Sequence, residues 1–228
     1  MDAKTKACNP ANYGGTRGMG IVDWIVIHYT SNLGDTAKNN ADYFAREAVK
    51  ASAHYFVDEH EVWASVPIYR TAWHCGAQAY KHPLCRNTNS IGVEICMNAK
   101  DGSVRQGSID RAAQLVRTLM GRYGIPPGHV LRHYDVTGKH CPGPMVDKPA
   151  LWEDFKARLT EDENMLTYEQ WKEYMARYLT EREGAAASAY AREPIDRMQA
   201  QGITDGQRPQ AFATREEVLT MLDRGLEK

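Results

Sequence analysis

Short apolar runs rich in β-branched residues alternate with amphipathic stretches over the first 160 residues, and this alternation limits the folds open to the chain. The run "DWIVIHYT" (23–30) has the length and composition of a buried strand. "HYFVDEHEVWASV" (54–66) predicts two strands around an acidic turn, and "SIGVEICMN" (90–98) predicts a further central strand. Strands interleaved with helical stretches favour a mixed α/β domain.

Three helices are expected between and after these strands, over 35–51, 108–124 and 147–159. Gly124 supplies a stop signal for the second, and a proline lies near the start of the third. The core faces are expected to be formed by Tyr43, Phe44 and Val49 in the first helix, Ala112, Leu115, Val116 and Leu119 in the second, and Leu151, Trp152, Phe155 and Leu159 in the third.

The segment "TEDENM" (160–165) is the most polar break in the chain and predicts a boundary between a domain at 1–160 and a small helical module at 161–228. Residues 1–160 carry 19 Lys and Arg against 15 Asp and Glu, whereas 161–228 carry 9 against 14. In the module, Thr167 with Gln170 and Thr214 with Glu217 have capping-box spacing, so each pair predicts a helix start.

Composition excludes several classes of protein. No apolar run approaches the roughly 18 residues of a membrane span, and no concentrated basic surface of the kind that binds nucleic acid is present. The N-terminal segment has lysines without an apolar core, which predicts synthesis in the cytoplasm without a signal peptide. Five cysteines suit free or metal-bound thiols, although Cys75 and Cys85 could pair in an oxidising medium.

The stretch "RHYDVTGKHCPGP" (132–144) concentrates metal-binding residue types on one loop. Zinc binds His nitrogen and Cys sulfur, and a catalytic zinc site uses three protein ligands. His28, at the end of the predicted strand, could complete such a set with His133 and Cys141. From spacing alone, ordinary core or surface histidines remain the alternative.

Five blocks together resemble a known family: "IVIHYT", "SAHYFVDEHEVW" (52–63), "TAWHCG" (71–76), "NSIGVEIC" (89–96) and "RHYDVTGKHCPGP". They follow one another as in the zinc-dependent N-acetylmuramoyl-L-alanine amidases of the peptidoglycan-recognition-protein-like superfamily, of the type found in phage and prophage endolysins. The resemblance covers about residues 20–160. It implies a central mixed β-sheet flanked by helices and hydrolysis of the amide between N-acetylmuramic acid and L-alanine in peptidoglycan.

The resemblance also implies roles for individual residues. His28, His133 and Cys141 stand at the positions of the Zn²⁺ ligands. Glu94 would relay the proton from water to the leaving nitrogen, and Lys139 would stabilise the oxyanion. Some members carry a catalytic tyrosine where this chain has Ala53, which places more of the catalysis on Glu94. The expected substrate-binding residues are Trp73, His74 and Tyr55.

Other functions stay open at this point. Some members of the superfamily bind peptidoglycan without cutting it, but these typically lack the cysteine ligand. A muropeptide-recycling amidase of the cytoplasm is a second alternative, and a structural-zinc or thiol-based regulatory protein is a third. Recycling enzymes need no additional module, so the tail favours an endolysin.

The tail segment 202–224 looks like part of a surface-layer-homology-like repeat, which predicts binding to the wall of a Gram-positive host. The alternative is a homo-oligomer that buries apolar residues of the module, namely Trp171, Tyr174, Tyr178, Leu219 and Leu222. The expected site of action is the cell wall, after release at lysis. Met165 could serve as an internal start that yields the free tail.

Overall fold

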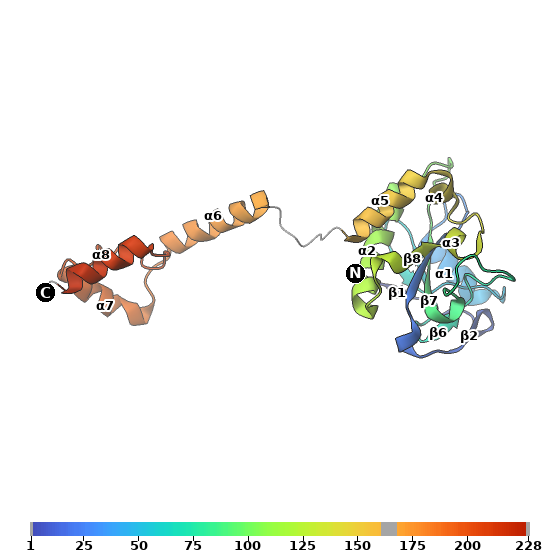
Figure 1. Cartoon of the computed structure of the whole chain (residues 1–228), viewed down its shortest axis with the longest axis horizontal. Helices are drawn as coiled ribbons and strands as arrows, with labels where there is room; N and C mark the ends of the chain where they lie inside the picture. The colour runs from blue at the N-terminus through green and yellow to red at the C-terminus, as the bar shows by residue number, and fades with distance from the viewer. Residues whose placement is uncertain (1, 161–167, 227–228) are drawn as a thin grey trace. The chain divides into compact units, whose positions relative to one another are not determined.

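The computed structural model describes residues 2–160 and 168–226 of the chain. They belong to two compact units, Met1–Glu161 and Asp162–Lys228, which are described separately below (Figure 1). Met165 and Thr167 lie outside the described residues, and the side chain of Gln170 is not described either, so the predicted capping box of Thr167 and Gln170 stays a prediction.

The first unit is built on a six-stranded sheet with the strand order β1-β5-β4-β7-β3-β8. β4 and β5 are antiparallel, and all other neighbours in the sheet run parallel. A mixed sheet flanked by helices confirms the predicted fold class. The strands are β1 (Lys4–Thr5), β3 (Trp24–Tyr29), β4 (Tyr55–Val57), β5 (Val62–Ala64), β7 (Ser90–Ile95) and β8 (Val130–Arg132).

The register of the two central strands decides which side chains share a face. β3 and β7 pair from Trp24 opposite Ser90 to Tyr29 opposite Ile95, so that His28 lies opposite Glu94. Because successive side chains of a strand point to opposite faces, His28 and Glu94 share one face of the sheet. The other face carries Ile25 and Ile27 of β3 and Ile91, Val93 and Ile95 of β7.

That other face is covered by α2 (Gln106–Tyr123) and α5 (Pro149–Thr160), which pack against each other (Figure 1). Both helices were predicted, and α2 ends at Gly124 as expected. Burial of these apolar faces supplies the main core, because each fully buried aliphatic or aromatic side chain stabilises the fold by roughly 1.5–3 kcal/mol. The predicted residues of the two helices are buried in this core, with Leu151 half-buried at its edge.

The first predicted helix is shorter than expected. α1 spans Ala37–Arg46 and packs on β4 and β5, and its buried residues are Ala37, Asn40 and Ala41. Phe44 contacts the core, but Tyr43 is 44% exposed and Val49 is 39% exposed, so those two predictions were wrong.

The early end of α1 is explained by hydrogen bonds of the buried Asn12 side chain. Its amide nitrogen donates to the carbonyls of Phe44 and Glu47, while its oxygen accepts from the backbone of Val49 and Lys50. These bonds take the place of the helical bonds that would continue α1, and the chain leaves the helix at Glu47.

Smaller elements complete the unit. β2 (Tyr13–Thr16) and β6 (Arg70–Ala72) form a separate antiparallel pair. Two short helices, α3 (His133–Thr137) and α4 (Gly143–Asp147), follow β8. Single-turn 3₁₀ helices lie at Pro10–Asn12, Met19–Ile21, Asn87–Asn89 and Pro127–His129.

Gly121 of α2 gives a test of the helix assignment. A Cβ at this position would meet no neighbouring atom within 4 Å. Gly121→Ala is therefore expected to raise the free energy of unfolding by about 0.5–1 kcal/mol, since alanine loses less backbone entropy in a helix. Gly102, which has a φ of 82°, is the control, and Gly102→Ala should destabilise. Urea unfolding measures both changes, and equal signs for the two variants would contradict the assignment.

The described residues of the second unit, 168–226, form three helices, α6 (Tyr168–Gly184), α7 (Ala189–Ala200) and α8 (Arg215–Leu226). The predicted capping box at the start of α8 is confirmed: the Thr214 backbone N–H donates to Glu217 Oε2 at 2.7 Å, and the Glu217 N–H donates to Thr214 Oγ1 at 3.2 Å. Among the described helices, none is long and apolar enough to cross a membrane.

Candidate active site

Three elements bring two histidines and a cysteine together on the face of the sheet opposite α2. His28 is near the end of β3, His133 is the first residue of α3, and Cys141 follows α3 in the loop that leads to α4. All three residues are buried, and one ligand atom from each lies within 4.8 Å of the other two. His28 Nδ1 is 3.8 Å from Cys141 Sγ. The structure therefore brings together the three predicted ligands.

The loop between His133 and Cys141 is held at several points. The backbone N–H of Tyr134 donates to the carbonyl of Cys141 at 2.8 Å. The Arg132 guanidinium forms a bidentate pair with the Asp135 carboxylate, with Nε–Oδ2 at 3.0 Å and Nη2–Oδ1 at 2.8 Å, and it also donates to the carbonyl of Met145. Such contacts hold the side chains of His133 and Cys141 in one arrangement, which is what metal binding needs.

Burial shifts the pKa values of these three groups toward the neutral forms. The pKa of His28 is well below its usual value because the ring is buried and lies near the charges of His74, His133 and Lys139. Burial likewise lowers the pKa of His133 to about 4, and it raises the pKa of the Cys141 thiol to about 12. His133 Nδ1 is buried and has no hydrogen-bond partner among the described residues. Two neutral imidazoles and a thiol, with one free nitrogen, form a donor set that suits zinc.

Glu94 lies beside this cluster, since it is paired in register with His28. Its Oε2 atom is enclosed and accepts no hydrogen bond from any residue that the structure describes. Burial raises the pKa of Glu94 to about 7; the charge of Lys139 opposes this shift and that of Asp35 adds to it. A carboxylate with a pKa near neutrality can both take up and release a proton at physiological pH.

Lys139 lies on the exposed part of the same loop. Its charge is close enough to lower the pKa values of Glu94, His28, His133 and Cys141. The site therefore contains the exposed Lys139 cation near the half-buried Glu94, and this combination can stabilise a developing negative charge.

The three predicted substrate-binding residues lie in different places. β6 leads directly into Trp73 and His74, and Trp73 lies against Gly14 of β2. His74 points inward, with Nδ1 3.0 Å from His28 Nε2. Tyr55 is paired with Val93 and packs on the core at α2, so the structure does not bring it to the site.

Sequence reasoning missed other residues near the site. Ser90, Gly92 and Glu94 share one face of β7, and Asp35 acts on the pKa of Glu94. The period of two in "SIGVEI" is the signal that could have grouped the β7 residues, because alternate positions of a strand point the same way.

Cys75, Cys85 and His140 are not part of the group of three ligands. Cys75 and Cys85 lie in one buried cluster with Trp24 and Val26, and both are free thiols here. His140 is exposed and contacts Asp147 at 2.7 Å.

The buried histidines predict how the stability of the metal-free chain depends on pH. The folded structure lowers the pKa values of His28, His54 and His133. Below about pH 6.5 these three histidines therefore bind protons in the unfolded chain but stay neutral in the folded chain. Stability should therefore fall as the pH drops from 6.5 toward 4. The raised pKa of Glu94 acts in the opposite direction between pH 4.5 and pH 7. Its effect is smaller than the combined effect of the three histidines.

The net effect is expected to be roughly 2 kcal/mol of unfolding free energy lost between pH 6 and pH 5. Urea unfolding of protein stripped of metal and desalted measures it at both pH values. Equal or greater stability at pH 5 would show that these histidines are not buried as described.

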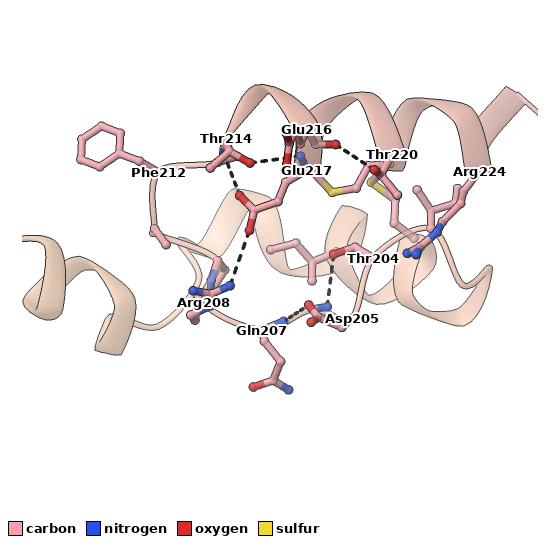
Figure 2. A pocket seen from close by; sticks show the side chains of 18 residues that line it. Thr204, Asp205, Gln207, Arg208, Phe212, Thr214, Glu216, Glu217, Thr220 and Arg224 are labelled. Atoms are coloured by element: carbon pink, nitrogen blue, oxygen red, sulfur yellow. Dashed lines mark hydrogen bonds and ion pairs between the residues drawn. The ribbon is translucent and has the colours of Figure 1, made fainter.

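The second unit has a cavity of about 710 Å³ between α7, the following loop and α8 (Figure 2). Apolar side chains such as Ile195, Met198 and Ile203 line it together with polar groups. Arg208 contacts Glu217 at 3.6 Å on its wall. Within the described residues, no metal-binding set of His, Cys, Asp or Glu side chains lies in this cavity.

Comparison with known proteins gives a family match over most of the first unit. The profile of the Amidase_2 family, described as N-acetylmuramoyl-L-alanine amidase, matches residues 18–144. A probable N-acetylmuramoyl-L-alanine amidase of Bacillus licheniformis is 37% identical over 150 residues, which cover 62% of this chain and 42% of that protein. The N-acetylmuramoyl-L-alanine amidase BlyA of Bacillus subtilis is 35% identical over 147 residues, or 59% and 40% of the two chains.

Solved structures agree with these sequence matches. The structure of PlyL superimposes with a TM-score of 0.62 and 29% identity, and the match covers 72% of this chain and 100% of that one. The catalytic domain of XlyA gives a TM-score of 0.58 and 27% identity, covering 70% and 99%. The match spans about two fifths of the length of the curated relatives.

Proposed function

Because the chain belongs to the Amidase_2 family of N-acetylmuramoyl-L-alanine amidases, we propose that it hydrolyses the amide bond between N-acetylmuramic acid and L-alanine in peptidoglycan. The observation that carries this proposal is the position of Glu94, whose enclosed Oε2 atom has no hydrogen-bond partner among the described residues and which is paired in register with His28 of the His28, His133 and Cys141 cluster. An acid with a pKa of about 7 next to a metal-binding set is suited to amide hydrolysis.

The proposed cofactor is one Zn²⁺ ion, held by His28, His133 and Cys141. The free Nδ1 of His133 and the closeness of the three ligand atoms support this assignment. Three ligands of the N, N and S type leave room for a fourth position, as catalytic zinc sites require. When bound, zinc supplies Lewis acidity, which makes water more acidic and polarises the amide carbonyl.

The chain's own residues would handle the proton and the charge. The Glu94 carboxylate takes a proton from the attacking water and passes it to the leaving nitrogen, so that the amine departs neutral. The Lys139 ammonium faces the carbonyl oxygen as it becomes negative and lowers the energy of the tetrahedral state. The proposed substrate-binding residue among those predicted is Trp73, which follows β6 and precedes His74, the residue in contact with His28.

Digestion of purified Bacillus peptidoglycan tests the proposed function. We expect release of L-alanine amino termini without new reducing ends, and we expect a zinc chelator to abolish it. New reducing ends would indicate a glycosidase instead. Binding to the wall without cleavage, even with zinc added, would favour a non-catalytic recognition protein. Cleavage restricted to soluble muropeptides would favour a recycling amidase.

We also propose that the second unit binds the bacterial cell wall and that the chain acts there as an endolysin. The cavity of Figure 2 supports a binding role, since apolar walls with a few polar groups are typical of ligand sites. Arg224 lines this cavity, and its guanidinium suits the anionic and hydroxyl groups of wall polymers. The Bacillus source of the relatives supports a Gram-positive wall as the target.

Co-sedimentation with Bacillus cell walls tests the binding role. The full chain with Glu94→Gln should sediment with the walls, and the further change Arg224→Ala should weaken binding several-fold. Arg215, which starts α8 but does not line the cavity, gives the control Arg215→Ala. Equal binding by both variants would count against the cavity. A dimer in sedimentation velocity would then favour self-association through exposed residues such as Trp171 and Leu222.

A further inference from the structure

The two ring nitrogens of His74 each face a hydrogen-bonding group inside the first unit. Nδ1 lies 3.0 Å from His28 Nε2, and Nε2 lies 3.2 Å from Ser90 Oγ. The Ser90 hydroxyl in turn donates to the backbone carbonyl of Arg86 at 2.6 Å. His74 therefore connects a candidate metal ligand to a backbone carbonyl through a chain of side chains.

The directions of these hydrogen bonds follow from the network. The Ser90 hydroxyl has one proton, which goes to the Arg86 carbonyl, so Ser90 Oγ accepts from His74 Nε2–H. A neutral imidazole with its proton on Nε2 has a lone pair on Nδ1, and this lone pair accepts from His28 Nε2–H. His28 then carries its own lone pair on Nδ1, the atom that lies 3.8 Å from Cys141 Sγ.

Two further contacts hold His74 in this position. The Asn87 side-chain oxygen accepts from the backbone N–H of His74 at 3.1 Å and from that of Cys75 at 2.8 Å. The ring of His74 lies directly on Gly92, where an added Cβ would come within 2.5 Å of His74 Cγ. Only glycine at this point of β7 leaves room for the ring.

We infer that His74 is a positioning residue, which holds His28 in the tautomer whose Nδ1 lone pair is directed at the metal site, and that Ser90 sets the tautomer of His74. The inference deepens the proposed function, because it concerns the ligands of the proposed zinc ion. The sequence predicted that His74 binds substrate, whereas this inference gives it the role of orienting the proposed zinc ligand His28. Replacing a residue that orients a metal ligand typically weakens metal binding 10- to 100-fold.

Zinc affinity, measured by competition with a chromophoric chelator, tests this role without any substrate. His74→Phe keeps the ring and removes both nitrogens, and it should weaken zinc binding about 10- to 100-fold. His74→Asn restores an acceptor near the position of Nδ1 and should recover part of the loss. His60, which is exposed beside Glu59, gives the matched control His60→Phe with unchanged affinity.

The tautomer itself can be read in the metal-free protein by long-range ¹⁵N–¹H NMR of the imidazoles. Wild-type His28 is expected to carry its proton on Nε2, and Ser90→Ala or His74→Phe should give a mixture of tautomers. This measurement does not depend on zinc loading, and Ser90→Ala keeps the test available if His74→Phe does not fold.

Two results would overturn the inference. One is a zinc affinity of His74→Phe within twofold of wild type, and the other is a metal-free His28 protonated on Nδ1. Failure of the proposed function would look different. In that case zinc affinity would still depend on His74, but peptidoglycan would not be cut.

Discussion

Glu94→Gln is expected to lower the rate of peptidoglycan hydrolysis by about 10²- to 10⁴-fold while zinc binding stays within a few-fold of wild type. Glutamine has nearly the shape of glutamate, but it cannot take a proton from water at neutral pH. The effect should fall on kcat rather than on KM, because the lost interaction belongs to the transition state. Release of amino termini from purified walls measures the rate, and chelator competition measures the metal.

The matched control is Glu153→Gln on the exposed surface of α5, where the carboxylate contacts only Lys156 in the described ion pairs. It should leave the rate unchanged. If Glu94→Gln hydrolysed walls at more than about a tenth of the wild-type rate, another group would have to be the general base.

Cys141→Ser is expected to raise the Kd for zinc on the order of 10³-fold or more, because a hydroxyl is a much poorer zinc ligand than a thiolate. The loss should also appear as stability. Zinc at 1,000 times the wild-type Kd stabilises the folded chain by about 4.1 kcal/mol, and a 10³-fold weaker site would leave about 0.4 kcal/mol. Thermal unfolding with and without zinc measures this difference.

Cys8→Ser is the control for the removal of a buried thiol. Cys8 is 4% exposed and donates to the Phe44 carbonyl, a contact that a serine hydroxyl can keep. Its zinc-dependent stabilisation should equal that of wild type. A zinc-dependent shift of the same size in Cys141→Ser would place the metal at other residues.

The sequence predicted the fold where the periodic pattern is long. β3, β7 and the helices α2 and α5 were expected at nearly their observed bounds, because each buries a continuous apolar face. β4 and β5 were expected from the acidic turn between them. β1, β6 and β8 have only two or three residues each and are not joined by a turn of that kind, so no pattern in the sequence indicated them. α1 was predicted too long because the bonds that end it come from Asn12, a residue far away in the chain.

The candidate site shows a similar division. The grouping of His28, His133 and Cys141 was expected from the resemblance of the ordered blocks, since their spacing alone matched no known zinc motif. The position of Tyr55 depends on which residues of β4 face the site. Phe56 is paired with Glu94 and shares its face of the sheet, so the neighbouring Tyr55 points to the face opposite the site. Without the register, no feature of the sequence distinguishes the two faces.

The position of His28 on β3 has a consequence for how the protein is made. Its partner Cys141 lies 113 positions later in the sequence, and both neighbours of β3 in the sheet, β7 and β8, also follow it. A growing chain on the ribosome therefore exposes the central strand well before its neighbours have been synthesised, and contacts of such long range fold slowly. The metal site can be assembled only after the loop containing Cys141 has emerged. A chain that ends before Cys141 would thus contain most of the first unit and still lack one of the three proposed zinc ligands.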